Sequence, residues 1–121
     1  MLQGFQQQTE PLTEYERDTL LPVIVRGLVN KVGEKMAITN AAITRAMKSA
    51  GYQLTEARLR KIINHIRVNG MVSCLIATSK GYYIATSRQE MEDYITSLRG
   101  REDAIRAVRE SMEQQLGRAA V

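Results

Sequence analysis

Residues 55–69 read TEARLRKIINHIRVN, and their spacing predicts one helix with two different faces. Four apolar residues recur at the interval of a buried helical stripe: Leu59, Ile62, Ile63 and Ile66. Thr55 is placed to cap the start of this helix, and Gly70 is placed to end it. The polar residues are cationic or carry an amide: Arg58, Arg60, Lys61, Asn64 and Arg67. Such a helix suits either a DNA groove or an ordinary solvated surface, so its neighbours have to distinguish the two.

A second helix is predicted just before it, over residues 40–50. Thr39 can cap its start, and Gly51 can adopt the left-handed conformation that ends it. Its predicted inward-facing residues are Ala42, Ile43, Ala46 and Met47. Two helices joined by about four residues that include a glycine form the helix-turn-helix arrangement.

After Gly70 the apolar period shortens from 3.6 to about 2, which predicts two strands at residues 71–78 and 81–86. Ser79, Lys80 and Gly81 lie between them and predict a tight turn. Cys74 falls within the first predicted strand, where we expect it to be a small buried hydrophobe.

The two ends of the chain are organised differently. Residues 1–12 are polar and glutamine-rich, which predicts a disordered tail. Thr13 and Glu16 form a T-x-x-E capping box that opens a first helix, with a kink or break at Pro22 and an end at Gly33. Residues 13–87 are thus the predicted domain, and residues 88–121 a final helix opened by a second capping box at Ser87.

The final helix carries a stripe of apolar residues that recur at about seven-residue intervals. Gly100 is expected to interrupt it, so that its first part packs and the remainder projects or bends. An exposed apolar stripe is a liability in a monomer, which predicts a homodimer. The expected dimerisation residues are Ile105, Val108, Met112 and Leu116.

Charge is distributed unevenly over the 121 residues. The net charge is +4, but residues 39–88 contain eight basic residues and one acidic residue, Glu56, for a local charge of +7. Such a concentration of positive charge is an electrostatic footprint for a polyanion. No apolar run is long enough to span a bilayer, and the N-terminus does not have the features of a signal peptide. With Cys74 as the only cysteine, we expect a cytoplasmic protein without an internal disulfide.

The order helix, short strand, helix, turn, helix, hairpin, helix resembles the winged helix-turn-helix family over residues 13–98. The segment SKGYYIATSRQEMEDYI, residues 79–95, is similar to the wing and closing helix of small winged-helix proteins of phages and mobile elements. The resemblance implies a mainly α fold with a small β-hairpin, a recognition helix (residues 55–69) in the major groove and a wing (residues 79–81). Two features depart from the family: Glu56 lies at the end of the helix that reads bases, and the wing is short.

Carried onto this chain, the resemblance implies binding of double-stranded DNA by a transcriptional regulator or a phage-type replication or regulatory protein. We expect phosphate contacts from Arg45, Lys48, Arg67 and Lys80, and base contacts from Arg60, Lys61 and Asn64, with Arg58 beside them. A protein-interaction module without DNA binding is the main alternative, and RNA binding is a third. The one histidine, His65, and the one cysteine mark no nucleophile or metal site, so we expect no enzyme activity and no cofactor.

Overall fold

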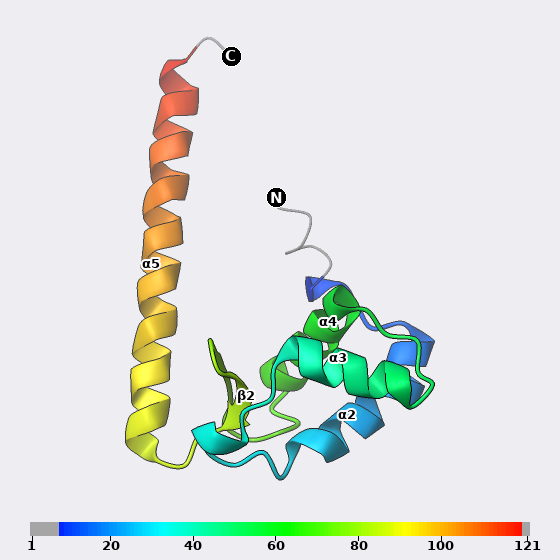
Figure 1. Cartoon of the computed structure of the whole chain (residues 1–121). Coiled ribbons are helices and arrows are strands. Elements are labelled where there is room, and N and C mark those ends of the chain that lie inside the picture. The colour runs from blue at the N-terminus through cyan, green and yellow to red at the C-terminus, as the bar shows by residue number, and fades with distance from the viewer. Residues whose placement is uncertain (1–7, 120–121) are drawn as a thin grey trace. The chain divides into compact units, whose positions relative to one another are not determined.

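The computed structural model describes residues 8–119, which divide into two units between Thr86 and Ser87. The first unit contains, in chain order, η1 (Glu16–Leu20), α2 (Leu21–Leu28), η2 (Glu34–Met36), α3 (Asn40–Ser49), α4 (Glu56–Val68), β1 (Leu75–Thr78) and β2 (Gly81–Ile84). The second unit is α5 (Arg88–Arg118). The predicted fold class, mainly α with a β-hairpin and a long C-terminal helix, is confirmed (Figure 1). Of the predicted disordered tail, residues 1–7 lie outside the described part of the chain.

The first helix begins as its capping box predicts. The Thr13 N–H donates to Glu16 Oε1 at 2.8 Å, and the Glu16 N–H donates to Thr13 Oγ1 at 3.2 Å. The helix starts as the π-turn η1 and continues as α2, with Pro22 in the first turn of α2, where a missing N–H does least harm. Leu20 and Leu21 both have α-helical dihedral angles, so the chain does not break at Pro22, and the departure from α-helix is the π-turn just before it.

The predicted end of this helix at Gly33 is wrong, because α2 ends at Leu28. The backbone that follows pairs with β2 instead: the Ile84 N–H donates to the Lys31 carbonyl at 2.8 Å, and the Gly33 N–H donates to the Ile84 carbonyl at 2.9 Å. A short bridge between Ile38 and Tyr82 adds to this edge of the hairpin. Tertiary hydrogen bonds thus take over the backbone groups that further helix would have used.

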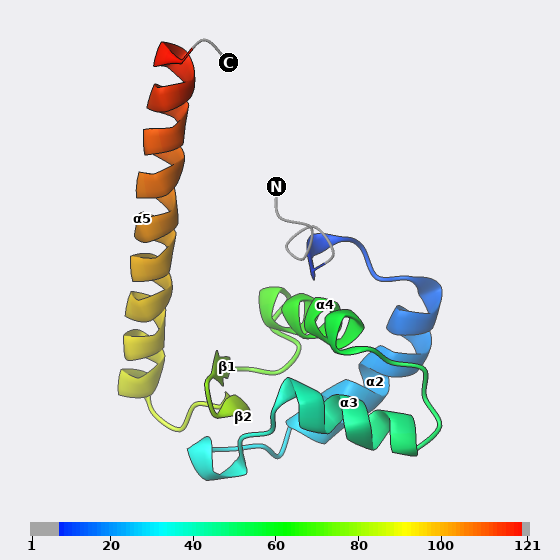
Figure 2. The same cartoon turned by 45° about the horizontal axis from the view of Figure 1, so that its top comes forward.

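Helices α3 and α4 begin at the predicted caps and contact each other (Figure 2). Thr39 Oγ1 accepts the Ala42 N–H at 3.1 Å, and Thr55 Oγ1 accepts the Arg58 N–H at 3.1 Å. Gly51 has a φ of +95°, as expected for the residue that ends α3. One inward-facing residue was predicted wrongly: Ala46 is exposed and Thr44 is buried.

The core of the first unit is built around α4. Its four predicted stripe residues are at most 3% exposed and belong to one apolar cluster: Leu59, Ile62, Ile63 and Ile66. Leu20 and Leu28 from the first helical stretch and Leu75 from β1 belong to the same cluster. Burying a side chain of this size contributes about 1.5–3 kcal/mol, so this stripe anchors α4 firmly.

The hairpin is real but shorter than predicted. Its register pairs Leu75 with Ile84 and Thr78 with Gly81, around a two-residue turn at Ser79 and Lys80. The prediction that Cys74 is a buried strand residue is wrong: it is exposed, has a φ of +59° and lies in the turn before β1. A residue in the left-handed region cannot continue a pleated strand, so β1 begins only at Leu75.

The C-terminal helix α5 is continuous over all 31 of its residues, so the expected interruption at Gly100 is wrong. Its start is capped by Ser87 Oγ, which accepts the Glu90 N–H at 3.1 Å. Ion pairs four residues apart follow along its surface, including Arg88 with Glu92 and Arg109 with Glu113. Each such pair stabilises the helix by a few tenths of a kcal/mol. Several pairs together therefore offset the roughly 1 kcal/mol by which one internal glycine destabilises it.

Candidate functional site

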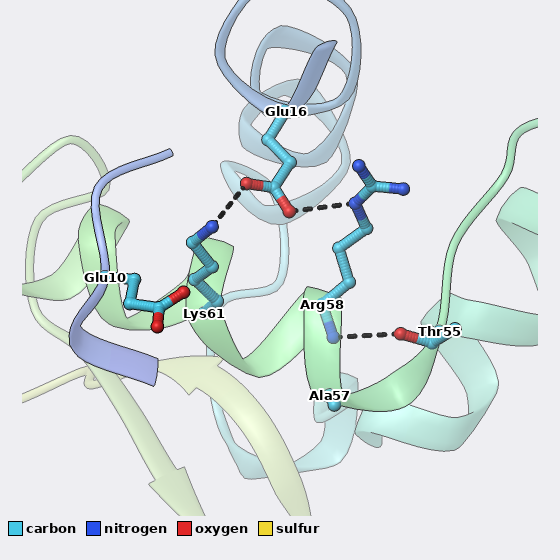
Figure 3. A pocket seen from close by; sticks show the side chains of 6 residues that line it. All are labelled: Glu10, Glu16, Thr55, Ala57, Arg58 and Lys61. Atoms are coloured by element: carbon cyan, nitrogen blue, oxygen red, sulfur yellow. Dashed lines mark hydrogen bonds and ion pairs between the residues drawn. The ribbon is translucent and has the colours of Figure 1, made fainter. Parts of the chain in front are cut away.

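A buried carboxylate, Glu16, lies against α4 and binds two of its cations (Figure 3). Its side chain is 4% exposed. Glu16 Oε1 lies 2.8 Å from Lys61 Nζ, and Glu16 Oε2 lies 2.8 Å from Arg58 Nε. These residues also line an open hollow at the start of α4, together with Glu10 and Thr55. The first helical stretch and α4 are therefore joined by charge as well as by the apolar core.

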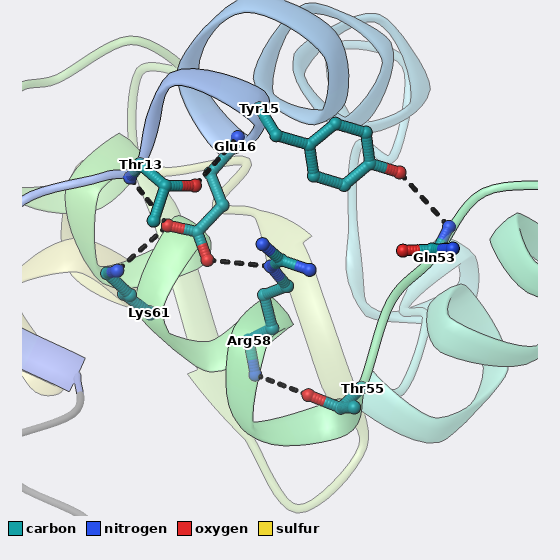
Figure 4. A network of polar contacts seen from close by, with 7 residues as sticks. All are labelled: Thr13, Tyr15, Glu16, Gln53, Thr55, Arg58 and Lys61. Carbon is teal, nitrogen blue, oxygen red and sulfur yellow. Dashed lines mark hydrogen bonds and ion pairs between the residues drawn. The ribbon is translucent and has the colours of Figure 1, made fainter.

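Tyr15 extends this network to the turn between α3 and α4 (Figure 4). Its hydroxyl oxygen accepts the Gln53 N–H at 3.0 Å. The Arg58 guanidinium carbon lies 5.0 Å from the centre of the Tyr15 ring, within the range of a cation–π contact. Arg58 is thus held between a carboxylate on one side and an aromatic face on the other.

The ionised form of Glu16 is strongly favoured in the folded protein. Burial by itself would raise the pKa of this carboxyl, because desolvation penalises the charged form. Hydrogen bonds from Lys61, from the Thr13 backbone N–H and from Arg58, together with the Lys61 charge, outweigh that effect and lower the pKa from 4.5 to about 2. Glu16 is therefore a structural anion at any pH near neutrality.

This network divides the predicted binding residues of α4 into two groups. Arg58 and Lys61 turn toward Glu16, and the Lys61 side chain is only 11% exposed. Arg60, Asn64 and Arg67 follow one another at the helical spacing of a single strip on α4, with Glu56 at its start. The Arg60 side chain is 47% exposed and lies 3.7 Å from Glu56, whereas Asn64 and Arg67 are half-buried.

The N-terminal segment approaches this strip. Asn64 Nδ2 donates to the Gln8 carbonyl at 3.3 Å, so residue 8 lies over the second half of α4. The strip therefore offers one exposed guanidinium, Arg60, and an amide with one of its two N–H donors already used. A partner bound along the whole strip would have to displace Gln8 or bind beside it.

The remaining predicted cations lie on α3 and on the hairpin. Arg45 and Lys48 are exposed on α3, and Lys80 is exposed at the turn between the strands. None of the three forms an ion pair within 4.0 Å with any residue in the described range 8–119. They are therefore available to an anionic partner.

The hairpin is tied to the start of α3. Asn40 Nδ2 donates to the Tyr82 hydroxyl at 2.9 Å, and a shallow hollow at this junction is lined by Thr39, Thr78 and Ser79 among others. Tyr83, which alternates with Tyr82 along β2, is 3% exposed, as expected for neighbours on opposite faces of a strand. This junction holds the turn that carries Lys80 in a defined place relative to α3.

Glu16 and Tyr15 were not predicted as site residues. The capping box identified Glu16 as the start of a helix, and that role is correct, but its cationic partners lie 42 and 45 residues further along the chain. No local pattern in the sequence connects such distant residues. The excess of basic residues on α4 over one acidic neighbour, Glu56, was the only available signal that an internal counter-ion was needed.

Metal binding and membrane insertion can each be compared with the side chains of the described residues. Between residues 8 and 119, no three His, Cys, Asp or Glu side chains come together in a way that could hold a metal ion. Within the same range, no helix has the length and apolar content required to cross a bilayer.

Comparison of the whole chain with models of protein families, with curated protein sequences and with solved structures found no match. Within the first unit, the described topology is two helices joined by a turn, preceded by a helix and followed by a hairpin. Function must therefore be argued from this topology and from the charges that it exposes.

Proposed function

We propose that this chain binds double-stranded DNA as a winged helix-turn-helix protein. In this proposal α4 enters the major groove, and the turn between β1 and β2 is a short wing on the DNA backbone. The observation that carries it is the set of exposed cations on α3, α4 and the hairpin: Arg45, Lys48, Arg60 and Lys80. Since the same stretch of chain contains one acidic residue, these charges favour a polyanionic partner.

The Glu16 network changes the roles that the sequence suggested. Arg58 and Lys61 are both held by one buried carboxylate, which offsets one of their two charges, so in the revised proposal they support α4 rather than read bases. Arg60 becomes the principal candidate for a base edge, because an arginine can donate two hydrogen bonds to guanine. Asn64 reads a neighbouring base only if its contact with Gln8 is exchanged for one with adenine.

The number of cations in contact with phosphate can be measured from the salt dependence of binding. Each neutralised phosphate contributes about −0.9 to the slope of log K against log salt concentration. The three exposed cations assigned to phosphate, Arg45, Lys48 and Lys80, predict a slope of about −2.7, whereas participation of Arg58 and Lys61 as well would bring it to about −4.5. The slope therefore distinguishes the revised interface from the one expected from sequence alone.

The test is fluorescence anisotropy of a labelled 20-base-pair duplex between 50 and 200 mM KCl, first with random sequence and then with sequences selected from a random pool. Lys80→Ala should weaken binding to all duplexes about equally and reduce the slope by about 1. Arg60→Ala should reduce the preference for selected over random sequence. Arg26→Ala, which removes an exposed cation from α2, is the matched control and should change neither. Absence of binding at 50 mM KCl would contradict the proposal.

A second function is favoured by one specific observation. Two cations of α4 are used internally and a third polar side chain contacts Gln8, which fits a protein-interaction module better than a helix open to a groove. That module would bind no duplex at any salt concentration in the anisotropy series. Duplex binding that weakens as the salt concentration rises would exclude protein interaction as the sole function.

A further inference from the structure

The continuity of α5 places six exposed apolar side chains on one stripe that crosses Gly100. They are 40–70% exposed: Ile95, Leu98, Ile105, Val108, Met112 and Leu116. At about 100° per residue, all six fall within an arc of about 140°. The stripe extends over three heptads, which is the length that a coiled coil needs. Since α5 is a separate unit of the chain, this face can be considered by itself.

We propose that α5 pairs in antiparallel orientation with α5 of a second copy of this chain, with Glu102 of each helix facing Arg109 of the other. This inference does not depend on DNA binding. Leu98, Ile105 and Met112 are seven residues apart and occupy heptad position a. Position d then contains Tyr94, Arg101, Val108 and Gln115, and position e contains Ile95, Glu102, Arg109 and Leu116.

A parallel pair in register would be poorly matched. Position d would place Arg101 directly against Arg101 of the second copy, inside the apolar seam, where two like charges repel strongly. Its flanking pairs would join Ser97 with Glu102 and Ala104 with Arg109, neither of which has opposite charges. Its apolar seam residues face their own copies, but the buried Arg101 pair and the uncharged partners at the edges disfavour this arrangement.

An antiparallel pair is matched at its centre and along its position-e edges. Ile105 of one copy meets Val108 of the other, twice by symmetry, which forms an apolar centre. Along position e, Ile95 meets Leu116 at both ends, and Glu102 meets Arg109 at both inner positions. The apolar centre, the two Ile95–Leu116 contacts and the two Glu102–Arg109 contacts are therefore complementary, whereas in the remaining seam layers Leu98 faces Gln115 and Met112 faces Arg101. The Arg101 side chains are far apart and can extend their charged ends to water beside Met112.

The ion pairs within α5 do not prevent these contacts. Glu102 lies 3.5 Å from Arg106, and Arg109 forms a contact with Glu113 at 2.6 Å. All four side chains are more than half exposed, so the pairs are weak and can be shared or exchanged. A carboxylate has two oxygens and a guanidinium five N–H groups, so each can also bind across the interface.

Exchanging the charges at these two positions tests the pairing. Self-association of the full chain is measured by sedimentation equilibrium. The wild-type chain should dimerise in a concentration-dependent manner. Glu102→Arg and Arg109→Glu should each weaken the dimer about tenfold, because each places like charges opposite one another at two symmetric positions. A mixture of the two variants should recover a heterodimer, because each contact then joins opposite charges again. Glu110→Arg, an exposed substitution on the other face of α5, is the control and should leave association unchanged.

Disulfide formation tests the orientation in a Cys74→Ser background. A chain with Glu102→Cys mixed with a chain with Arg109→Cys should form a mixed disulfide, since these positions face each other only in the antiparallel pair. Leu98→Cys should form none with itself, because the two copies of residue 98 would be about 25 Å apart along the axis at 1.5 Å per residue. A monomer at all concentrations, no recovery in the mixture, or a disulfide between two Leu98→Cys chains would each overturn the proposal.

Discussion

Replacing Glu16 with glutamine should destabilise the first unit far more than the loss of one charge at the surface would. The substitution preserves the size of the side chain but leaves Lys61 and Arg58 without the carboxylate that lies 2.8 Å from each. The pKa of Glu16 is lowered from 4.5 to about 2. At about 1.36 kcal/mol per unit, the ionised form contributes about 3 kcal/mol to the free energy of unfolding. That is a large part of the 5–15 kcal/mol typical of a small domain.

The effect should depend on pH in a defined direction. Because the pKa of Glu16 is lower in the folded state, the unfolded chain binds more protons as the pH falls below 4.5, and acid therefore reduces stability. The contribution is complete above about pH 4.5 and is lost as the pH approaches 2. The difference in unfolding free energy between wild type and Glu16→Gln should accordingly be about 3 kcal/mol at pH 7 and should narrow toward zero at pH 2.

Urea denaturation at several pH values provides the measurement, with tyrosine fluorescence as the signal because Tyr15 lies within the network. Glu14→Gln is the matched control, since it removes the same charge from an exposed neighbour and should change stability by less than about 0.5 kcal/mol. Equal stabilities for the two variants at pH 7 would refute the reasoning. So would a difference for Glu16→Gln that stayed constant down to pH 2.

Three further substitutions follow from the backbone and the helix caps. Gly81→Ala should destabilise the hairpin by more than about 1 kcal/mol in urea denaturation, because φ is +121° and the added Cβ would lie 2.5 Å from the Ile38 carbonyl oxygen. At Gly100 an added Cβ would have no atom within 4 Å, so Gly100→Ala should increase the helicity of α5, measured by circular dichroism. The free energy of helix formation should become more favourable by up to about 1 kcal/mol. Thr55→Ala should cost about 1 kcal/mol in the same denaturation assay by removing the acceptor of the Arg58 N–H, and Thr55→Ser should restore most of it.

Local patterns in the sequence identified the main helices and the hairpin of this fold, although not all of their ends. The apolar stripe of α4, the caps at Thr39 and Thr55, and the change to strand periodicity after Gly70 each depend on residues that are near neighbours in the chain. Capping and periodicity involve residues only a few positions apart, so short segments of sequence are enough to identify them. The stripe on α5 was visible for the same reason, although its continuity across Gly100 was not.

The tertiary structure alone decided which charges remain available. Arg58 and Lys61 look like their neighbours Arg60 and Arg67 in the sequence, yet one carboxylate more than forty residues away binds both of the first two. A contact between distant residues also explains the early end of α2. After Leu28, backbone groups of Lys31 and Gly33 form hydrogen bonds with Ile84 instead of continuing the helix. Residues 55–69 thus determine by themselves that a helix forms and which face is buried. Which of its cations can reach a partner is set by Glu16, because only folding brings a buried anion within 2.8 Å of them.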